Sequence, residues 1–101
     1  MFDAIEQDVG PVSILVNNAG VAKPIDFLET TIEDFQAVID LNLTGTFVAL
    51  QRAAKSMVAN KIEGAIINMS SVNAQLAIPS IASYCASKGG VMQLTLSLIH
   101  I

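Results

Sequence analysis

Tyr84 and Lys88 are the residues of this chain whose types and spacing are best suited to chemistry. They stand four positions apart, so on a helix they lie on one face, one turn from each other. An ammonium group beside a phenol favours the phenolate form, and such a tyrosine can exchange a proton with an alcohol or carbonyl oxygen. The pair alone is more typical of the exposed face of an amphipathic helix. Its interpretation therefore depends on the elements that position it.

The composition describes a chain that is too apolar for an ordinary small domain. Of its 101 residues, 52% are hydrophobic and only 14% are charged, and the mean hydropathy is +0.58. A free-standing domain of this size has much surface to cover and normally carries more charge. We expect either that part of the surface meets a partner or that the chain is a piece of a larger domain.

Charge and cysteine content exclude several classes of function. The net charge is −4, the carboxylates mostly precede residue 41, and no basic cluster is present, which argues against nucleic acid and anionic membranes as partners. The single cysteine, Cys85, cannot form an internal disulfide, so a cytoplasmic setting is expected with Cys85 as a small buried hydrophobe. His100 has no neighbouring ligands, so no metal site is predicted.

Two segments have a superficial likeness to targeting or membrane signals. The opening Met1-Phe2-Asp3 begins an acidic helical pattern, unlike the basic start of a signal peptide. The segment 64–87 has no charged residue, but asparagine, glutamine, serine and proline interrupt it, so it is not a membrane span.

Apolar periodicity and turn residues divide the chain into helices and strands. The sequence predicts a helix over 1–9, a buried strand over 12–16 and a second strand over 64–69. Between the strands, a helix begins at Thr30 or Thr31, kinks near Asn42 and continues from there as a second helix to about residue 60. A last helix runs from Ser80 or Ile81 to the end. This order is α/β and implies a parallel sheet with right-handed crossovers. Two strands with about three to four helices are too few for a complete parallel sheet. We therefore expect residues 1–101 to be the central portion of one larger domain.

Polar side chains follow both predicted strands at the edge where ligands bind open parallel sheets. The loop 17–29 follows the first strand, and the loop 70–80, with Ser71 near its start, follows the second. Tyr84 opens the next helix, and Asn42 at the kink can reach the same region. Such clustering favours a catalytic site over the exposed-helix interpretation.

Four motifs in this order resemble the short-chain dehydrogenase/reductase family. They are Asn17-Asn18-Ala19-Gly20 after a strand, Leu41-Asn42-Leu43-Thr44-Gly45 in the kinked helix, Ile67-Asn68-Met69-Ser70-Ser71 ending a strand, and Tyr84-x-x-x-Lys88. The resemblance covers Phe2 to about Thr95. It implies a Rossmann-like, doubly wound parallel sheet, of which this chain holds part, and an oxidoreductase that uses NAD or NADP to interconvert an alcohol and a carbonyl.

The resemblance also implies a role for each residue of the site. Tyr84 is the general acid/base, and Lys88 favours its phenolate form and holds the nicotinamide ribose. Ser71 binds the substrate oxygen, and Asn42 anchors a water of a proton relay. On the cofactor side, Asn17, Ala19 and Gly20 lie near the adenosine ribose. By the same resemblance, the intact protein is a homodimer or homotetramer acting on a small alcohol or ketone.

Parts of the family pattern are missing from this chain. No glycine-rich phosphate loop, no residue that selects NAD or NADP, and no later strands are present, so the chain alone is expected to be inactive. The tail Leu96–Ile101 departs from the family pattern and is interpreted as read-through of foreign sequence. An alternative function stays open: a non-catalytic truncated chain that associates through its two long helices.

Overall fold

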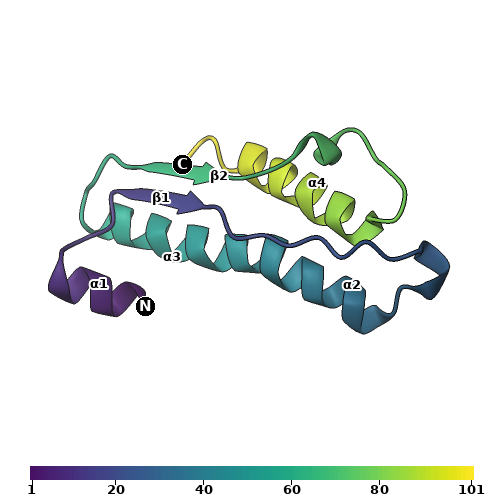
Figure 1. Ribbon diagram of the computed structural model, residues 1–101. Coiled ribbons are helices and arrows are strands. Elements are labelled where there is room, and N and C mark those ends of the chain that lie inside the picture. The colour runs from purple at the N-terminus through teal and green to yellow at the C-terminus, as the bar shows by residue number, and fades with distance from the viewer.

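The computed structural model describes all residues from Met1 to Ile101. Four α-helices accompany two short parallel strands (Figure 1). In chain order the elements are α1 (Phe2–Asp8), β1 (Ile14–Asn17), α2 (Ile32–Ile39), a π-helical segment (Asp40–Thr44), α3 (Gly45–Ala59), β2 (Ala65–Asn68) and α4 (Ala82–Ser97), with 3₁₀ turns at Phe27–Glu29 and Val72–Ala74. The predicted α/β order and parallel pairing are confirmed.

The two strands form a parallel pair in which their last residues stand side by side. The register runs from Ile14 opposite Ala65 to Asn17 opposite Asn68. Parallel strands need a long crossover connection, and α2, the π-helical segment and α3 supply it here. Because the strands are parallel and in register, the loops after β1 and β2 leave from the same edge.

Only one face of the strand pair is covered. Side chains alternate along each strand between a partly buried and an exposed face, and α3 packs against β1. On the open face, Ile14 is 65% exposed, Val16 is 53% exposed and Ile67 is 51% exposed. The two faces of a sheet in a complete α/β domain are normally both covered.

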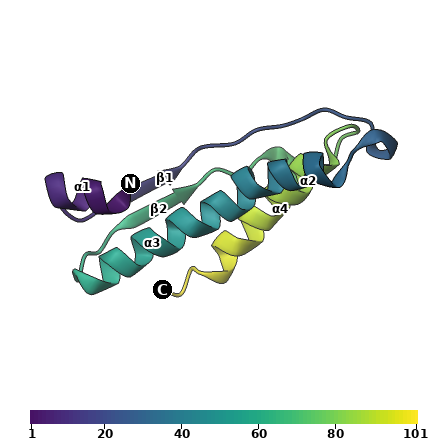
Figure 2. The ribbon, with the colours of Figure 1, turned by 90° about the horizontal axis from the view of Figure 1, so that it is seen from below.

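The crossover is one long rod that runs through α2, the π-helical segment and α3 (Figure 2). Thr31 caps its start, because its hydroxyl accepts a hydrogen bond from the Asp34 N–H at 3.1 Å, as the acidic first turn predicts. The expected kink near Asn42 takes the form of the π-helical segment, and helical backbone dihedrals continue through it. A single turn of π-helix inside an α-helix shifts the side chains that follow it, and such turns are frequent at functional sites.

Helix α4 packs closely on the rod through small residues. Its buried positions Ser83, Ser87 and Val91 recur every four residues and form one stripe. A Cβ added at Gly90 would lie 2.8 Å from a methyl carbon of Leu43, so glycine permits this close approach. The helix predicted from Ser80 or Ile81 to the end of the chain is present as α4, but it ends at Ser97 and does not reach the end of the chain.

Helix α1 is attached to α3 by polar contacts. The Arg52 guanidinium donates hydrogen bonds to Asp3 at 2.8 Å and to Glu6 at 2.9 Å, and lies 5.3 Å from the centre of the Phe2 ring. These hydrogen bonds from Arg52 hold the pKa of the Asp3 carboxyl and that of Glu6 below their ordinary values, and a hydrogen bond from Ser56 acts in the same direction on Glu6. No residue of α1 is buried, so the ion pairs are its principal attachment.

The core is narrow: one part lies between α4 and the α2 and π-helical part of the rod, and the other lies along α3, which packs against β1. It consists of five apolar residues and six polar or charged ones: Val38, Leu50, Ala53, Met57 and Val91, with Asn42, Thr46, Ser56, Ser83, Ser87 and Lys88. Buried polar groups are costly unless they are hydrogen-bonded. The buried members Asn42, Ser87 and Lys88 meet that condition at the carboxyl edge of the strands.

Candidate functional site

Lys88 is a buried lysine at the carboxyl edge of the strands. It is 5% exposed, and its ammonium donates a hydrogen bond to the main-chain carbonyl of Met69 at 2.8 Å. Met69 is the first residue after β2, so this bond ties α4 to the end of the strand. An ammonium carries three donors, so two remain for other acceptors. Because the Lys88 ammonium is held in this way, a ligand can reach its two remaining donors only from one side.

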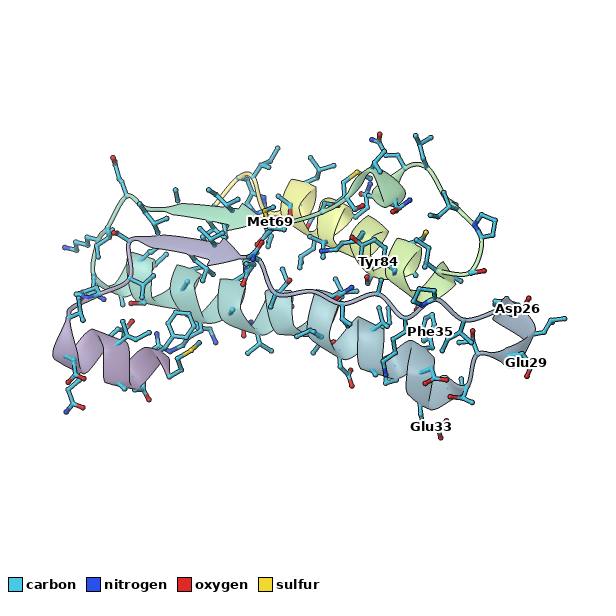
Figure 3. All side chains as sticks on the ribbon, in the orientation of Figure 1. Asp26, Glu29, Glu33, Phe35, Met69 and Tyr84 are labelled. Carbon is cyan, nitrogen blue, oxygen red and sulfur yellow. The ribbon has the colours of Figure 1, made fainter.

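Tyr84 lies one turn before Lys88 on α4, as the spacing predicts. The Lys88 ammonium nitrogen is 5.7 Å from the centre of the Tyr84 ring, and the tyrosine is half-buried. Figure 3 shows Met69 at the end of β2 and Tyr84 between α4 and the segment that follows β1. The phenol and the ammonium therefore share one region, where a positive charge stands close to the aromatic ring.

Asn42, at 0% exposed, joins this region from the π-helical segment. Its side-chain oxygen accepts from the Val21 N–H at 2.8 Å, and its amide nitrogen donates to the Val21 carbonyl at 2.8 Å. The same nitrogen donates to the Ser87 hydroxyl at 3.0 Å. The amide thus fixes the loop after β1 against the rod and α4.

Gly20 leaves a small space between two of these polar groups. A Cβ added there would lie 3.5 Å from the side-chain oxygen of Asn42 and 3.5 Å from the ammonium of Lys88. Because glycine carries no side chain, this space stays open to a small polar group such as a water molecule.

A cavity of about 390 Å³ collects these features. It is lined by eight residues from the segment after β1, the end of β2 and α4: Asn18, Gly20, Val21, Ala22, Met69, Ser70, Tyr84 and Lys88. Its size falls in the range of ligand pockets, ~300–1,000 Å³. Tyr84, Lys88 and Gly20, three of the residues singled out from the sequence, therefore face one hollow.

Ser71 is not brought to this cavity by the structure. Its hydroxyl accepts from the Asn73 N–H at 3.2 Å and caps the 3₁₀ turn of its own loop. The neighbouring Ser70 lines the cavity, and its hydroxyl donates to the Lys88 carbonyl at 2.9 Å. Ser70 thus ties the end of β2 to α4, and Ser71 lies in the loop beside the site.

Of the residues predicted on the cofactor side, Gly20 lines the cavity, whereas Asn17 and Ala19 do not. The Asn17 amide donates to the Asn68 side chain at 2.9 Å and to the Thr46 carbonyl at 3.4 Å, so it joins β1 to β2 and α3. Asn68 in turn donates to Thr95 on α4 at 3.0 Å. Ala19 is exposed and lies between Asn17 and the cavity-lining Gly20.

The sequence reasoning missed two contributors, Asn68 and Ser87. Asn68 had a recognisable signal, because it ends β2 as Asn17 ends β1, and asparagine is unusual in a buried strand. Ser87 had none, since a serine among small helix residues is ordinary. Its role becomes visible only through its burial and its contact with Asn42.

The structure also bears on metal sites and on membrane-spanning helices. No group of three or more histidine, cysteine, aspartate and glutamate side chains is arranged to hold a metal ion. None of the helices has both the length and the apolar character needed to cross a bilayer.

Comparison with known proteins gives consistent matches along the chain. The family model described as short chain dehydrogenase matches residues 1–100. The 3beta-hydroxysteroid dehydrogenase 1 of Eggerthella lenta is 47% identical over 100 residues, which cover 97% of this chain and 38% of that protein.

Solved structures match equally well. The gluconate 5-dehydrogenase of Burkholderia cenocepacia, solved with NADP and tartrate, superposes with a TM-score of 0.91 at 39% identity, covering 98% of this chain and 38% of the other. A 4-hydroxyisoleucine dehydrogenase complexed with NADH gives 0.93 at 32% identity, with 98% and 44% coverage. This chain spans 34% to 39% of the length of the curated relatives that it matches.

Proposed function

Because this chain belongs to the short-chain dehydrogenase family, we propose that it is the central part of a nicotinamide-dependent oxidoreductase that interconverts an alcohol and a carbonyl. The observation that carries the proposal is the convergence of Tyr84, Lys88 and Gly20 on one cavity at the carboxyl edge of the strands. Tyr84 and Lys88 come from α4 and Gly20 comes from the segment after β1. Ligands of open parallel sheets bind at this edge.

Tyr84 is the proton-transferring residue in this proposal. Its half-exposed phenol faces the cavity, where it can give a proton to a carbonyl oxygen or take one from an alcohol. The Lys88 ammonium stands 5.7 Å from the centre of the Tyr84 ring, so a positive charge lies beside the proposed proton-transferring residue. Ser71, in the loop beside the cavity, is the residue proposed to bind the substrate oxygen.

The cavity has features that suit the ribose end of a nicotinamide cofactor. Lys88 retains two ammonium hydrogens for ribose hydroxyls, and the Gly20–Ala22 segment presents a wall with small side chains. When bound, NAD or NADP supplies the carbon centre that accepts or gives the hydride. Solved relatives with NADP and with NADH support either cofactor.

Asn42 and Gly20 provide a place for a proton relay behind Lys88. The amide of Asn42 is held by Val21 and Ser87, so its oxygen keeps one fixed orientation. The open space at Gly20 borders that oxygen and the Lys88 ammonium, which is where a bridging water would pass a proton towards solvent.

We further propose that residues 1–101 are the centre of a longer Rossmann-like domain in a cytoplasmic protein. The exposed apolar face of the strand pair supports this, since Ile14, Val16 and Ile67 need covering. The lengths of the relatives agree, because the chain spans little more than a third of them. Their names include a hydroxysteroid and a gluconate dehydrogenase, so the proposed substrate is defined only as a small alcohol or ketone.

A second candidate function is association with another copy through helices. An apolar groove of about 450 Å³ runs along α3 to the C-terminal residues, between Phe47, Leu50 and Val58 on one side and Leu98 and Ile101 on the other. Val58 is 78% exposed. Val58→Glu should therefore reduce a dimer or tetramer to monomers in analytical ultracentrifugation, and an unchanged mass would exclude this groove as the interface.

Two assays separate the candidates. A longer protein containing this chain should interconvert alcohols and ketones only when NAD(H) or NADP(H) is added, as absorbance of the reduced nicotinamide reports. The 101-residue chain itself should show no saturable binding in a fluorescence titration with NADH or NADPH, because the phosphate-binding part is missing. Micromolar binding by the 101-residue chain would contradict the proposal that this chain lacks the phosphate-binding part of the cofactor site.

A further inference from the structure

Ser87 is a fully buried serine at the contact between α4 and the π-helical segment. It is 0% exposed and lies between Tyr84 and Lys88 in the sequence, three residues after the first and one before the second. Its hydroxyl donates to the Tyr84 main-chain carbonyl at 2.8 Å and accepts from the Asn42 amide at 3.0 Å. Both capacities of this hydroxyl are thus in use.

The hydrogen-bond directions around Asn42 are fixed by the backbone of Val21. The Val21 N–H can only donate, so it must face the oxygen of the Asn42 side chain. The amide nitrogen then faces the Val21 carbonyl and Ser87, and it places one hydrogen on each. Ser87 must accept there, which sends its own proton to the carbonyl of Tyr84.

This chain of bonds connects both sides of the proposed site. Val21 and Tyr84 line the same cavity, one from the segment after β1 and the other from α4. The Asn42 amide bonds to Val21 directly and reaches Tyr84 only through Ser87. No other side-chain hydrogen bond links Asn42 to α4.

We propose that Ser87 is a positioning residue, which couples the turn of α4 that carries Tyr84 and Lys88 to the Val21 wall of the cavity through the Asn42 amide. Its catalytic meaning rests on the proposed function, whereas the coupling itself is a property of this chain. Removing the hydroxyl leaves one Asn42 N–H buried without an acceptor, and such a group favours local opening.

Amide hydrogen exchange at Val21 tests the coupling in the 101-residue chain. Ser87→Ala should accelerate exchange of the Val21 N–H by about tenfold, since the amide that accepts from it is no longer held on its other side. Ser83→Ala is the matched control, because Ser83 is a buried serine one turn earlier on α4 and its hydroxyl makes no side-chain hydrogen bond in this structure. Equal Val21 exchange in the two variants would overturn the coupling.

Two further measurements complete the test of Ser87. If Ser87→Ala loses the helical circular dichroism of the parent, the exchange of the Val21 N–H is measured in Ser87→Cys instead, because a thiol is a weak hydrogen-bond donor and acceptor. In the longer protein, Ser87→Ala should lower kcat per folded site by about tenfold with little change in KM, and Ser83→Ala should not. An unchanged kcat would overturn the positioning role. A parent without dehydrogenase activity would instead refute the proposed function, with the exchange result unaffected.

Discussion

Replacing Gly20 with alanine tests whether the space between Asn42 and Lys88 belongs to the catalytic machinery. The added Cβ would lie 3.5 Å from the Asn42 oxygen and 3.5 Å from the Lys88 nitrogen, both ordinary van der Waals distances. The Gly20 backbone is outside the left-handed region, so alanine introduces no backbone strain. The substitution therefore fills the space without a clash.

The expected effects on folding and on turnover differ in size. The free energy of unfolding should change by no more than ~0.5 kcal/mol, as for substitutions without strain or cavity. A methyl group excludes a bridging water, because even one water molecule needs its own small volume. General acid–base catalysis contributes ~10²–10⁴ in rate, and loss of the relay alone should lower kcat by about tenfold to a hundredfold.

Urea denaturation of the 101-residue chain and steady-state kinetics of the longer protein measure these two quantities. Gly89→Ala is the matched control, since its Cβ would lie 3.7 Å from the Ala74 carbonyl, outside the cavity, and should stabilise α4 by about 0.5–1 kcal/mol. If Gly20→Ala folds normally and turns over like the parent, the space at Gly20 has no role in proton transfer.

The other predictions concern the supports of the site. Asn42→Leu leaves both backbone groups of Val21 without their partner, and should lower the free energy of unfolding by about 2–4 kcal/mol in a denaturant titration; a loss below the error of the fit would contradict this. Acid should release α1, because the pKa values of Asp3 and Glu6 are lowered from 3.8 and 4.5 and the Arg52 pairs are lost as pH falls below those values. Limited proteolysis against pH detects this step, which Arg52→Gln should abolish, and an equal pH dependence in that variant would refute it.

Local sequence signals predicted the elements that hold the site. The apolar runs gave both strands, the Thr31 cap gave the start of α2, and the i, i+4 spacing placed Tyr84 and Lys88 on one face of α4. These features depend on neighbouring residues in the chain, which is why a single sequence reveals them. The position of the parallel edge followed from element order alone.

Hydrogen bonds between distant segments were not predictable in the same way. The backbone of Val21 gives no sequence signal, yet both of its polar groups pair with Asn42, twenty-one positions away. The irregularity at Asn42 was expected as a kink, whereas the structure has a π-helical segment there, and the asparagine side chain bonds to Val21 and Ser87 outside that segment. The Ser71 hydroxyl accepts from the Asn73 N–H within its own loop, and the loop conformation that brings this donor near has no local sequence signal.

The turnover of Tyr84→Phe in the longer protein shows whether Tyr84 moves the proton. Phenylalanine keeps the ring beside Lys88 and removes only the hydroxyl, so the helical circular dichroism and binding of the reduced cofactor should be those of the parent. We expect kcat to fall by at least ~10²-fold, because the proton-transferring group is gone. A variant that folds, binds the cofactor and retains the parent turnover would show that Tyr84 is not the residue that moves the proton.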